Sequence, residues 1–207
     1  MIQEPVVIIA NGNFPTHPTP LGILKDANTI ICCDGAVNEM LEKGLEPHYI
    51  LGDMDSINDV MRNKFRDRII ELPDQYENDL RKAIIWIENN GTKKAIILGA
   101  TGKRDDHSLA NIFTLLQYPS QMELMMYSNN GIFSLVENEQ KFDSFIGEQI
   151  SLFSANPEIE LTTTNLKYNL NNKTLHNLYC GSLNESIDES FTISLSQGKI
   201  LVYQVFA

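Results

Sequence analysis

The chain is poor in basic residues, in cysteine and in long apolar runs, and each shortage argues against a class of protein. It has 16 Lys and Arg residues against 27 Asp and Glu residues, and the resulting formal net charge of −11 is a poor match for nucleic acid. No apolar run approaches the length that spans a membrane. The N-terminal apolar segment, Val6–Ala10, follows Glu4 and does not have the form of a signal peptide. These observations predict a cytoplasmic protein with no nucleic-acid or membrane partner.

The cysteines are few, and their spacing indicates no cross-link. Cys32 and Cys33 are adjacent within an apolar segment, and Cys180 lies far along the chain. An odd number without metal-ligand spacing indicates buried thiols in a reducing compartment, with neither a disulfide framework nor a zinc site. With 207 residues, 43% of them hydrophobic, the chain can fill the core of one medium domain or of two small ones.

The first part of the chain alternates short apolar segments with helical patterns. The predicted strands are Val6–Ala10, Thr29–Cys33, Tyr49–Leu51, Ile69–Leu72, Ala95–Leu98 and Glu123–Tyr127. The predicted helices carry their apolar residues at Val37, Met40 and Leu41; at Leu80, Ala83, Ile84 and Ile87; and at Leu109, Ile112, Phe113 and Leu116. Strands that alternate with helices of this length indicate βαβ units and a mostly parallel, Rossmann-like α/β sheet.

After about residue 128 the pattern changes to strands without a convincing helix between them. The predicted strands are Gly131–Glu137, Gln149–Ala155, Glu160–Leu166, Phe191–Ser196 and Lys199–Phe206. The last two are expected to form a hairpin across Gln197 and Gly198. The sequence therefore predicts an α/β domain over residues 1–128 and an antiparallel β-sandwich over residues 129–207.

Two carboxylates one residue apart, Asp53 and Asp55, follow the apolar segment Tyr49–Leu51. Magnesium prefers oxygen ligands and typically takes one or two carboxylates together with substrate phosphates. The alternative is an ordinary turn, because Asp and Ser favour turns through bonds from side chain to backbone. The spacing alone leaves both interpretations open.

Polar side chains also follow the other predicted strands. Ligands bind outside the carboxyl ends of the strands in open α/β sheets, so these residues are expected to share one edge. They are Asn11 and Gly12, Asp34 and Gly35, Asp74 and Gln75, Asn78 and Asp79, and the segment from Gly99 to His107. So many acidic groups at one edge repel each other unless a cation neutralises them. The arrangement favours a cation site over a turn for Asp53 and Asp55.

The Gly99–Gly102 segment can bring backbone N–H groups close to a phosphate at a helix N-terminus. Lys103 and Arg104 could stabilise charge on phosphoryl oxygens, or could form a solvated basic turn. Asp79 could bind the metal or merely favour the start of its helix, and His107 could donate to phosphate or be a simple hydrogen-bonding residue. The sequence has no Walker A pattern, which argues against a P-loop nucleotidase.

Taken together, these motifs resemble the thiamine pyrophosphokinase family. The motifs that carry the resemblance are Cys33–Asn38, Gly52–Ser56, Asp74-Gln75 with Asn78-Asp79, Gly99–Asn111, Asn165–Leu170 and Gly181–Glu185, and they span nearly the whole chain. The resemblance implies transfer of a pyrophosphoryl group from ATP to the hydroxyl of thiamine, which yields thiamine diphosphate and AMP. It also implies Mg²⁺ and a homodimer whose active site lies between subunits.

The resemblance also implies roles for individual residues. Asp53, Asp55 and Asp79 are expected to hold magnesium and, with Arg104 and Asp106, to be catalytic. The expected nucleotide-site residues are Asp34, Gln75, Asn78, Gly102, Lys103 and His107. Ser182 and Asn184 are expected to contact the thiamine pyrimidine.

Four positions depart from the family pattern. Asn78 replaces a Thr, Lys103 replaces the second Gly of Gly-Gly-Arg, Asp105 replaces an apolar residue, and Leu183 replaces the Ser of Ser-Asn. Two alternative functions fit the sequence less well. One is a haloacid-dehalogenase-type phosphatase that uses Asp53 and Asp55, although its motif is expected near the first strand. The other is a non-catalytic protein of this fold that senses nucleotide or thiamine.

Overall fold

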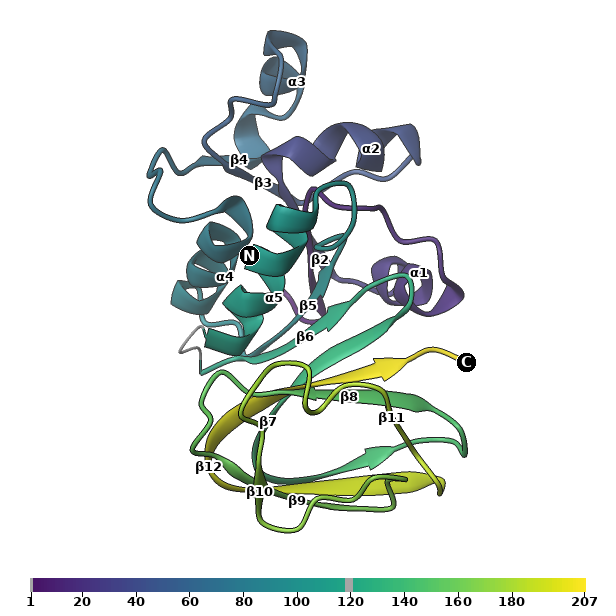
Figure 1. Ribbon diagram of the computed structural model, residues 1–207. Helices are drawn as coiled ribbons and strands as arrows, with labels where there is room; N and C mark the ends of the chain where they lie inside the picture. Colours follow the sequence, from purple (N-terminus) through teal and green to yellow (C-terminus); the bar gives the residue numbers. More distant parts are fainter. Residues whose placement is uncertain (1, 118–120) are drawn as a thin grey trace. The chain divides into compact units, whose positions relative to one another are not determined.

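The computed structural model describes residues 2–117 and 121–207. These residues form two compact units, Met1–Asn129 and Asn130–Ala207, which are drawn in purple to teal and in green to yellow in Figure 1. The first unit is an α/β unit, and the second consists of antiparallel strands. The predicted fold class is therefore confirmed.

The first unit contains a six-stranded parallel sheet in the spatial order β6-β5-β1-β2-β3-β4. Its strands are β1 (Val6–Ile9), β2 (Thr29–Cys33), β3 (Tyr49–Gly52), β4 (Ile69–Glu71), β5 (Lys94–Leu98) and β6 (Glu123–Tyr127). Every residue of β1 and β2 is buried, as expected for central strands covered on both faces. The chain order reverses between β1 and β5, and ligands of open α/β sheets bind at such a point.

Helices cover both faces of this sheet. Val7 and Ile9 share one hydrophobic cluster with Leu24 and Met40, which come from α1 and α2. On the other face, α4 packs against β2 and β3, and Figure 1 shows α4 and α5 together on one side of the strands and α1 on the other. The helices are α1 (Pro18–Lys25), α2 (Val37–Glu42), α3 (Asp59–Lys64), α4 (Asp79–Asn89) and α5 (Asp105–Gln117), with short 3-10 segments at Asp34–Ala36 and Arg66–Arg68.

The predicted helices α2, α4 and α5 are confirmed, whereas α1 and α3 were not expected. Helix α4 buries Leu80, Ala83, Ile84 and Ile87 on one face, as its spacing predicts. In α5 the expectation is wrong for Leu109, which is 57% exposed, because the first half of this helix borders a cleft rather than the sheet. None of the helices in the described parts of the chain is long and apolar enough to cross a membrane.

The second unit is built around two long antiparallel strands, β7 (Gly131–Asp143) and β12 (Ser190–Val205). The shorter strands are β8 (Gln149–Phe153), β9 (Glu160–Thr164), β10 (Lys173–Thr174) and β11 (Asn184–Glu185). The first half of β12 pairs with β9, and its second half pairs with β8. One sheet therefore continues to β10 and the other to β11, with a shared core that includes Ile150, Leu161 and Phe191.

The predicted hairpin across Gln197 and Gly198 is wrong. Phe191–Ser196 and Lys199–Phe206 belong largely to the single strand β12, whose register with β7 shifts between Ser194 and Lys199. Gly198 has a φ of +65° at this irregularity. Strands that pass from one sheet of a sandwich to the other bend at bulges of this kind, and a glycine there gives the same local signal as a hairpin turn.

Candidate active site

A cleft of about 660 Å³ lies at the carboxyl ends of the strands of the first unit. This volume is within the usual range for a site that binds a small molecule or cofactor. The loops after β1 and β5 are joined at the point where the chain order reverses, since the Asn13 N–H donates to the Thr101 carbonyl at 2.7 Å. The predicted site residues that line the cleft are Asp34, Asp53, Asp55, Gln75, Asn78, Asp79, Gly102, Lys103, Arg104 and His107.

Three carboxylates converge in this cleft. Asp34, Asp53 and Asp55 each offer an oxygen, and these oxygens lie within 4.8 Å of one another. Between the last two, Met54 is buried in the core cluster and has a φ of +66°. The left-handed Met54 thus turns its apolar side chain into the core and leaves the flanking carboxylates at the cleft.

Asp34 is the buried member of the group, with 2% of its surface exposed. Burial, followed by the charges of Asp79, Asp53 and Asp55, raises its pKa to about 6. Its Oδ2 atom has no hydrogen-bond partner among the described residues. A Cβ atom on Gly52 would lie 2.9 Å from the Asp34 Cγ, so a glycine is needed at the end of β3 for this carboxylate to reach the cluster.

Hydrogen bonds hold Asp53 and Asp55 in place. The Gln75 Nε2 donates to the Asp53 Oδ2 at 2.7 Å, and the Asp55 backbone N–H donates to the Asp53 Oδ1 at 3.3 Å. The bond from Gln75, followed by the one from Asp55, lowers the pKa of Asp53. The Ser56 hydroxyl donates to Asp55 at 2.9 Å. Asp53 therefore remains ionised beside a carboxylate that titrates near neutrality.

Asp79 opens α4, and Asn78 caps this helix by accepting the Arg81 N–H at 2.9 Å. Burial raises the pKa of Asp79, while the nearby Lys82 opposes this effect. The Lys82 Nζ lies 3.3 Å from the Asp79 Oδ1. The group of three convergent carboxylates therefore contains Asp34, and Asp79 is paired with a lysine. This arrangement differs from the metal set that the family resemblance implies.

The glycine-rich loop after β5 folds back on its own helix. The Gly102 N–H donates to the Ser108 Oγ at 2.9 Å, so this donor is already in use. Gly102 has a φ of +82°, and Lys103, where the family pattern has glycine, has a φ of +58°. The Lys103 Nζ contacts the Glu39 Oε2 at 2.8 Å and the Asn11 Oδ1 at 3.3 Å. The lysine thus links this loop to α2 and to the end of β1.

Arg104 and Asp106 form a two-bond ion pair at the start of α5. The Arg104 Nε and Nη2 donate to the two carboxylate oxygens of Asp106 at 3.1 and 2.6 Å. This hydrogen bonding lowers the pKa of Asp106 to about 2 and raises that of Arg104. Asp106 also accepts the backbone N–H of His107 at 3.0 Å. Arg104 and His107 line the cleft, whereas Asp106 acts on it through Arg104.

The two residues predicted to contact thiamine lie in the second unit. The Ser182 hydroxyl donates to the Tyr179 carbonyl at 2.8 Å. Asn184 is buried, and both the oxygen and the nitrogen of its amide are hydrogen-bonded: the Oδ1 accepts the N–H groups of Tyr168 and Glu185, and the Nδ2 donates to the Tyr168 carbonyl. The neighbouring Leu183 is 79% exposed with a φ of +61°.

Tyr76, Lys82 and Asn111 are among the cleft residues that were not predicted as site residues from the sequence. The Asn111 Nδ2 donates to the Ala100 carbonyl at 2.8 Å, and its Oδ1 accepts the Asn78 Nδ2 at 3.2 Å, so it joins α4, α5 and the end of β5. Lys82 stands three residues after Asp79, a helical spacing that brings the two side chains together. That spacing was a signal available in the sequence.

The donor set of the cleft fits a hard divalent cation. It consists of carboxylate oxygens, which Mg²⁺ prefers, and one of them is a buried oxygen without a partner in the described structure. Basic side chains, Lys103 and Arg104, lie on the same cleft. The arrangement can therefore bind a polyphosphate whose charge is shared between a metal ion and these cations.

Comparisons with known proteins give the family. A model described as "Thiamin pyrophosphokinase, catalytic domain" matches residues 22–127, and one described as "Thiamin pyrophosphokinase, substrate-binding domain" matches residues 131–203. "Thiamin pyrophosphokinase 1" of Caenorhabditis elegans is 26% identical over 160 residues, which cover 70% of this chain and 65% of that protein. "Thiamine pyrophosphokinase" of Bacillus subtilis (strain 168) is 28% identical over 217 residues, which cover 97% of this chain and 98% of that protein.

A solved structure, "Thiamin pyrophosphokinase from Candida albicans", has the same fold, with a TM-score of 0.78 at 19% identity over 97% of this chain and 89% of that chain. The matches support neither the phosphatase nor the sensor alternative. Because the two family models cover the α/β unit and the strand-rich unit in turn, the chain belongs to the thiamin pyrophosphokinase family.

Proposed function

We propose that this chain transfers the pyrophosphoryl group of ATP to the hydroxyl of thiamine, giving thiamine diphosphate and AMP. Membership of the family makes the chain a transferase, and ATP is the co-substrate of that family. The observation that carries the proposal is the group formed by Asp34, Asp53 and Asp55 in the cleft of a matched catalytic domain. Such a group can hold a hard divalent cation, and a nucleotide polyphosphate binds the same kind of cation.

In the proposed site Asp34, Asp53 and Asp55 hold Mg²⁺, and Asp79 lies beside them with Lys82. When bound, Mg²⁺ would neutralise charge on the phosphate oxygens of ATP. The unpartnered Oδ2 of Asp34 supports this assignment, since buried polar atoms are almost always paired. Gln75 supports it as well, because its bond to Asp53 fixes one carboxylate oxygen and leaves the other facing Asp55.

The reaction is an in-line displacement at the β-phosphorus. The thiamine hydroxyl oxygen forms a bond to this phosphorus and releases its proton to solvent, the bond from the phosphorus to the α,β-bridging oxygen breaks, and AMP leaves with that oxygen. The chain contributes position and charge: Lys103 and Arg104 bind phosphate oxygens, and Asn78 and His107 complete the nucleotide site. The Asp106 carboxylate holds the Arg104 guanidinium in one orientation and leaves its remaining N–H groups to bind phosphate oxygens.

For thiamine, we propose that the segment around Ser182 and Asn184 forms the binding surface. Asn184 is engaged with Tyr168 and Glu185, so its role is to hold that segment in shape. The Ser182 side chain is half-buried and closer to the surface. Leu183, which is exposed, offers an apolar contact where the family pattern has a hydroxyl.

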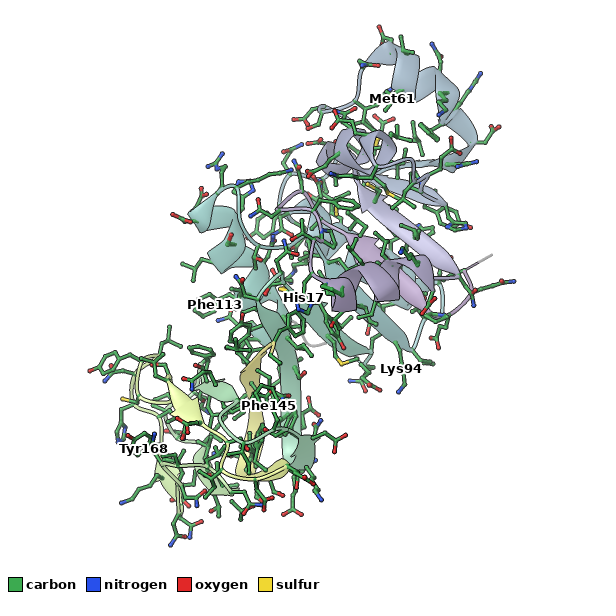
Figure 2. All side chains as sticks on the ribbon, turned by 90° about the vertical axis from the view of Figure 1, so that its right-hand side faces the viewer. His17, Met61, Lys94, Phe113, Phe145 and Tyr168 are labelled. Atoms are coloured by element: carbon green, nitrogen blue, oxygen red, sulfur yellow. The ribbon has the colours of Figure 1, made fainter. Side chains whose placement is uncertain are left out.

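We also propose a homodimer in the cytoplasm. Several large apolar side chains of the second unit are exposed, and a second subunit could cover them. They are Ile146 (72%), Tyr168 (64%), Tyr179 (74%), Leu183 (79%) and Ile187 (52%), and Tyr168 is labelled on the strand-rich part in Figure 2. The three cysteines are free thiols, which supports a reducing compartment; Cys32 and Cys33 are buried as predicted, whereas Cys180 is exposed and the prediction is wrong for it.

The test is product stoichiometry. Thiamine, ATP and Mg²⁺ incubated with the chain should give AMP and thiamine diphosphate in equal amounts, followed by phosphorus NMR. Release of inorganic phosphate without AMP would support a phosphatase instead. Nucleotide binding without any product would support a sensor.

A further inference from the structure

Lys82 is a buried cation in the cleft that none of the assigned roles uses. It lies in the second turn of α4, its side chain is 6% exposed, and it lines the cleft together with the acidic group. Lysine is almost never buried this completely unless it is paired. The placement therefore calls for anionic partners.

The partners within the described chain are too few for this ammonium group. Among the described residues the Lys82 Nζ has one hydrogen-bond partner, the Asp79 Oδ1 at 3.3 Å, which is a long bond, whereas an ammonium group has three N–H donors. Buried donors are normally satisfied by protein, water or ligand. Two N–H groups of Lys82 therefore remain available to a ligand in the cleft.

The surroundings of Lys82 are those of the phosphate site. The pKa of Asp53 is lowered first by its bond from Gln75 and also by the charge of Lys82, so the ammonium lies within electrostatic range of the carboxylate group. The other basic residues of the cleft already have carboxylate partners and are much more exposed: Lys103 with Glu39 is 42% exposed, and Arg104 with Asp106 is 67% exposed. A charge in a buried position acts more strongly on a ligand than a screened one at the surface.

We propose that Lys82 is a phosphate-binding residue, whose ammonium group binds oxygens of the pyrophosphoryl part of ATP while Asp79 holds it in place. The assignment rests on the proposed function, because it needs a polyphosphate in the cleft. The Lys82 ammonium is then a buried positive charge among the four carboxylates of Asp34, Asp53, Asp55 and Asp79 in the cleft. Asp79 then acts as the positioning residue for Lys82.

The experiment measures the affinity for Mg·ATP by titration calorimetry without thiamine, so that no turnover occurs. Lys82→Met, which keeps the length of the side chain, should weaken binding roughly 10- to 100-fold, the loss expected for hydrogen bonds to a charged group. Lys82→Arg should retain most of the affinity. Arg81→Met is the matched control, because it removes one positive charge from the neighbouring position, which does not line the cleft, and it should change binding less than about twofold.

A second comparison separates direct contact from an effect through Asp79. In the Asp79→Asn background, adding Lys82→Met should weaken Mg·ATP binding further, whereas a lysine that acts only on Asp79 would add nothing. Equal affinity of the wild-type and Lys82→Met chains, or no added loss in the double variant, would overturn the assignment of Lys82 alone. Failure of the wild-type chain to bind Mg·ATP would overturn the proposed function and this inference together. Thermal unfolding of each variant checks that it is folded.

Discussion

The cleft of the first unit and the Asn184 segment of the second unit differ in how far the hydrogen bonds of their buried polar side chains are satisfied. In the cleft, Asp34 has a buried oxygen without a partner in the described structure, and Lys82 has one long contact for three donors. In the second unit, every polar atom of the Asn184 amide is bonded to the backbone of Tyr168 or Glu185. Both regions were predicted as sites from sequence motifs, but of the two it is the cleft that contains a buried polar atom without a partner in the described structure.

The difference shows how to distinguish residues that bind a ligand from residues that stabilise the local fold. A buried polar group whose partners are all local stabilises the fold, and removing it destabilises the segment. A buried group without a partner reduces stability and is retained where a ligand completes it. The following changes test that division by comparing effects on activity with effects on stability.

The largest effect is expected from the half-buried Asp53 and the exposed Asp55 of the carboxylate group. Asp53→Asn or Asp55→Asn should lower kcat/KM at least about 10³-fold, because the metal site loses a charged ligand. The free energy of unfolding should change by less than about 1 kcal/mol, since both residues lie at a surface cleft. Steady-state kinetics and urea denaturation measure the two quantities. A large loss of stability with full activity per folded molecule would make these residues structural.

Asp34→Asn should stabilise the metal-free protein at neutral pH. The folded-state pKa of about 6 lies above the ordinary value of 3.8, so the folded chain binds more protons than the unfolded chain between these values. Wild-type stability therefore falls as the pH rises from about 4 to about 6, by up to about 3 kcal/mol. Urea denaturation in EDTA should show no gain for Asp34→Asn at pH 4 and the full gain at pH 7. A gain that is the same at both pH values would contradict the assignment.

Gly52→Ala should displace the Asp34 carboxylate. The added Cβ would lie 3.1 Å from the Asp34 Oδ2, and the φ of +156° is unfavourable for alanine. We expect a loss of about 2 kcal/mol in the free energy of unfolding and weaker Mg²⁺ binding. Gly44→Ala is the matched control, since its φ is also positive at +73° but no atom lies within 4 Å of its added Cβ. If both variants bind Mg²⁺ as the wild type does, Gly52 has no part in the site.

Asn184→Ala should lower the stability of the protein and leave its affinity for Mg·ATP nearly unchanged. It removes both bonds to the Tyr168 backbone and should lower the free energy of unfolding by about 1–2 kcal/mol. Mg·ATP affinity, measured by calorimetry, should stay within about twofold of the wild type. Ser182→Ala is the milder companion, because it removes one hydroxyl bond at a half-buried position. Loss of Mg·ATP binding in Asn184→Ala, with its stability intact, would contradict the claim that Asn184 stabilises the second unit and takes no part in nucleotide binding.

Much of the fold and of the cleft followed from the sequence, because the signals were local and repeated. The parallel strands were marked by apolar segments, and the rule for strand ends brought Asp53, Asp55 and Asp79 to one edge. The choice of Asp34 as the third convergent carboxylate was not predictable, since it depends on how closely its side chain approaches Gly52 across two strands.

Other errors have a similar origin. Gly198 marks a bend in β12, and the sequence cannot distinguish a bend between two sheets from a hairpin, because both use a left-handed glycine. The apolar spacing of α5 predicted the helix and the burial of Leu116 but not that of Thr114 and Leu115, while Leu109 is 57% exposed. Lys82 was missed because a lysine after an acidic helix start resembles an ordinary surface ion pair.

The central claim is that the carboxylates of the cleft form a cation site and do not serve the fold. The most direct test is the rise in the midpoint of thermal unfolding that Mg²⁺ produces in the wild type, in Asp34→Asn and in Asp67→Asn, an exposed aspartate outside the cleft. A ligand that binds only the folded state raises the midpoint, and at a fixed concentration the rise grows with the logarithm of its affinity. The account predicts an equal rise in the wild type and Asp67→Asn and little or none in Asp34→Asn. The same rise in all three proteins would contradict it.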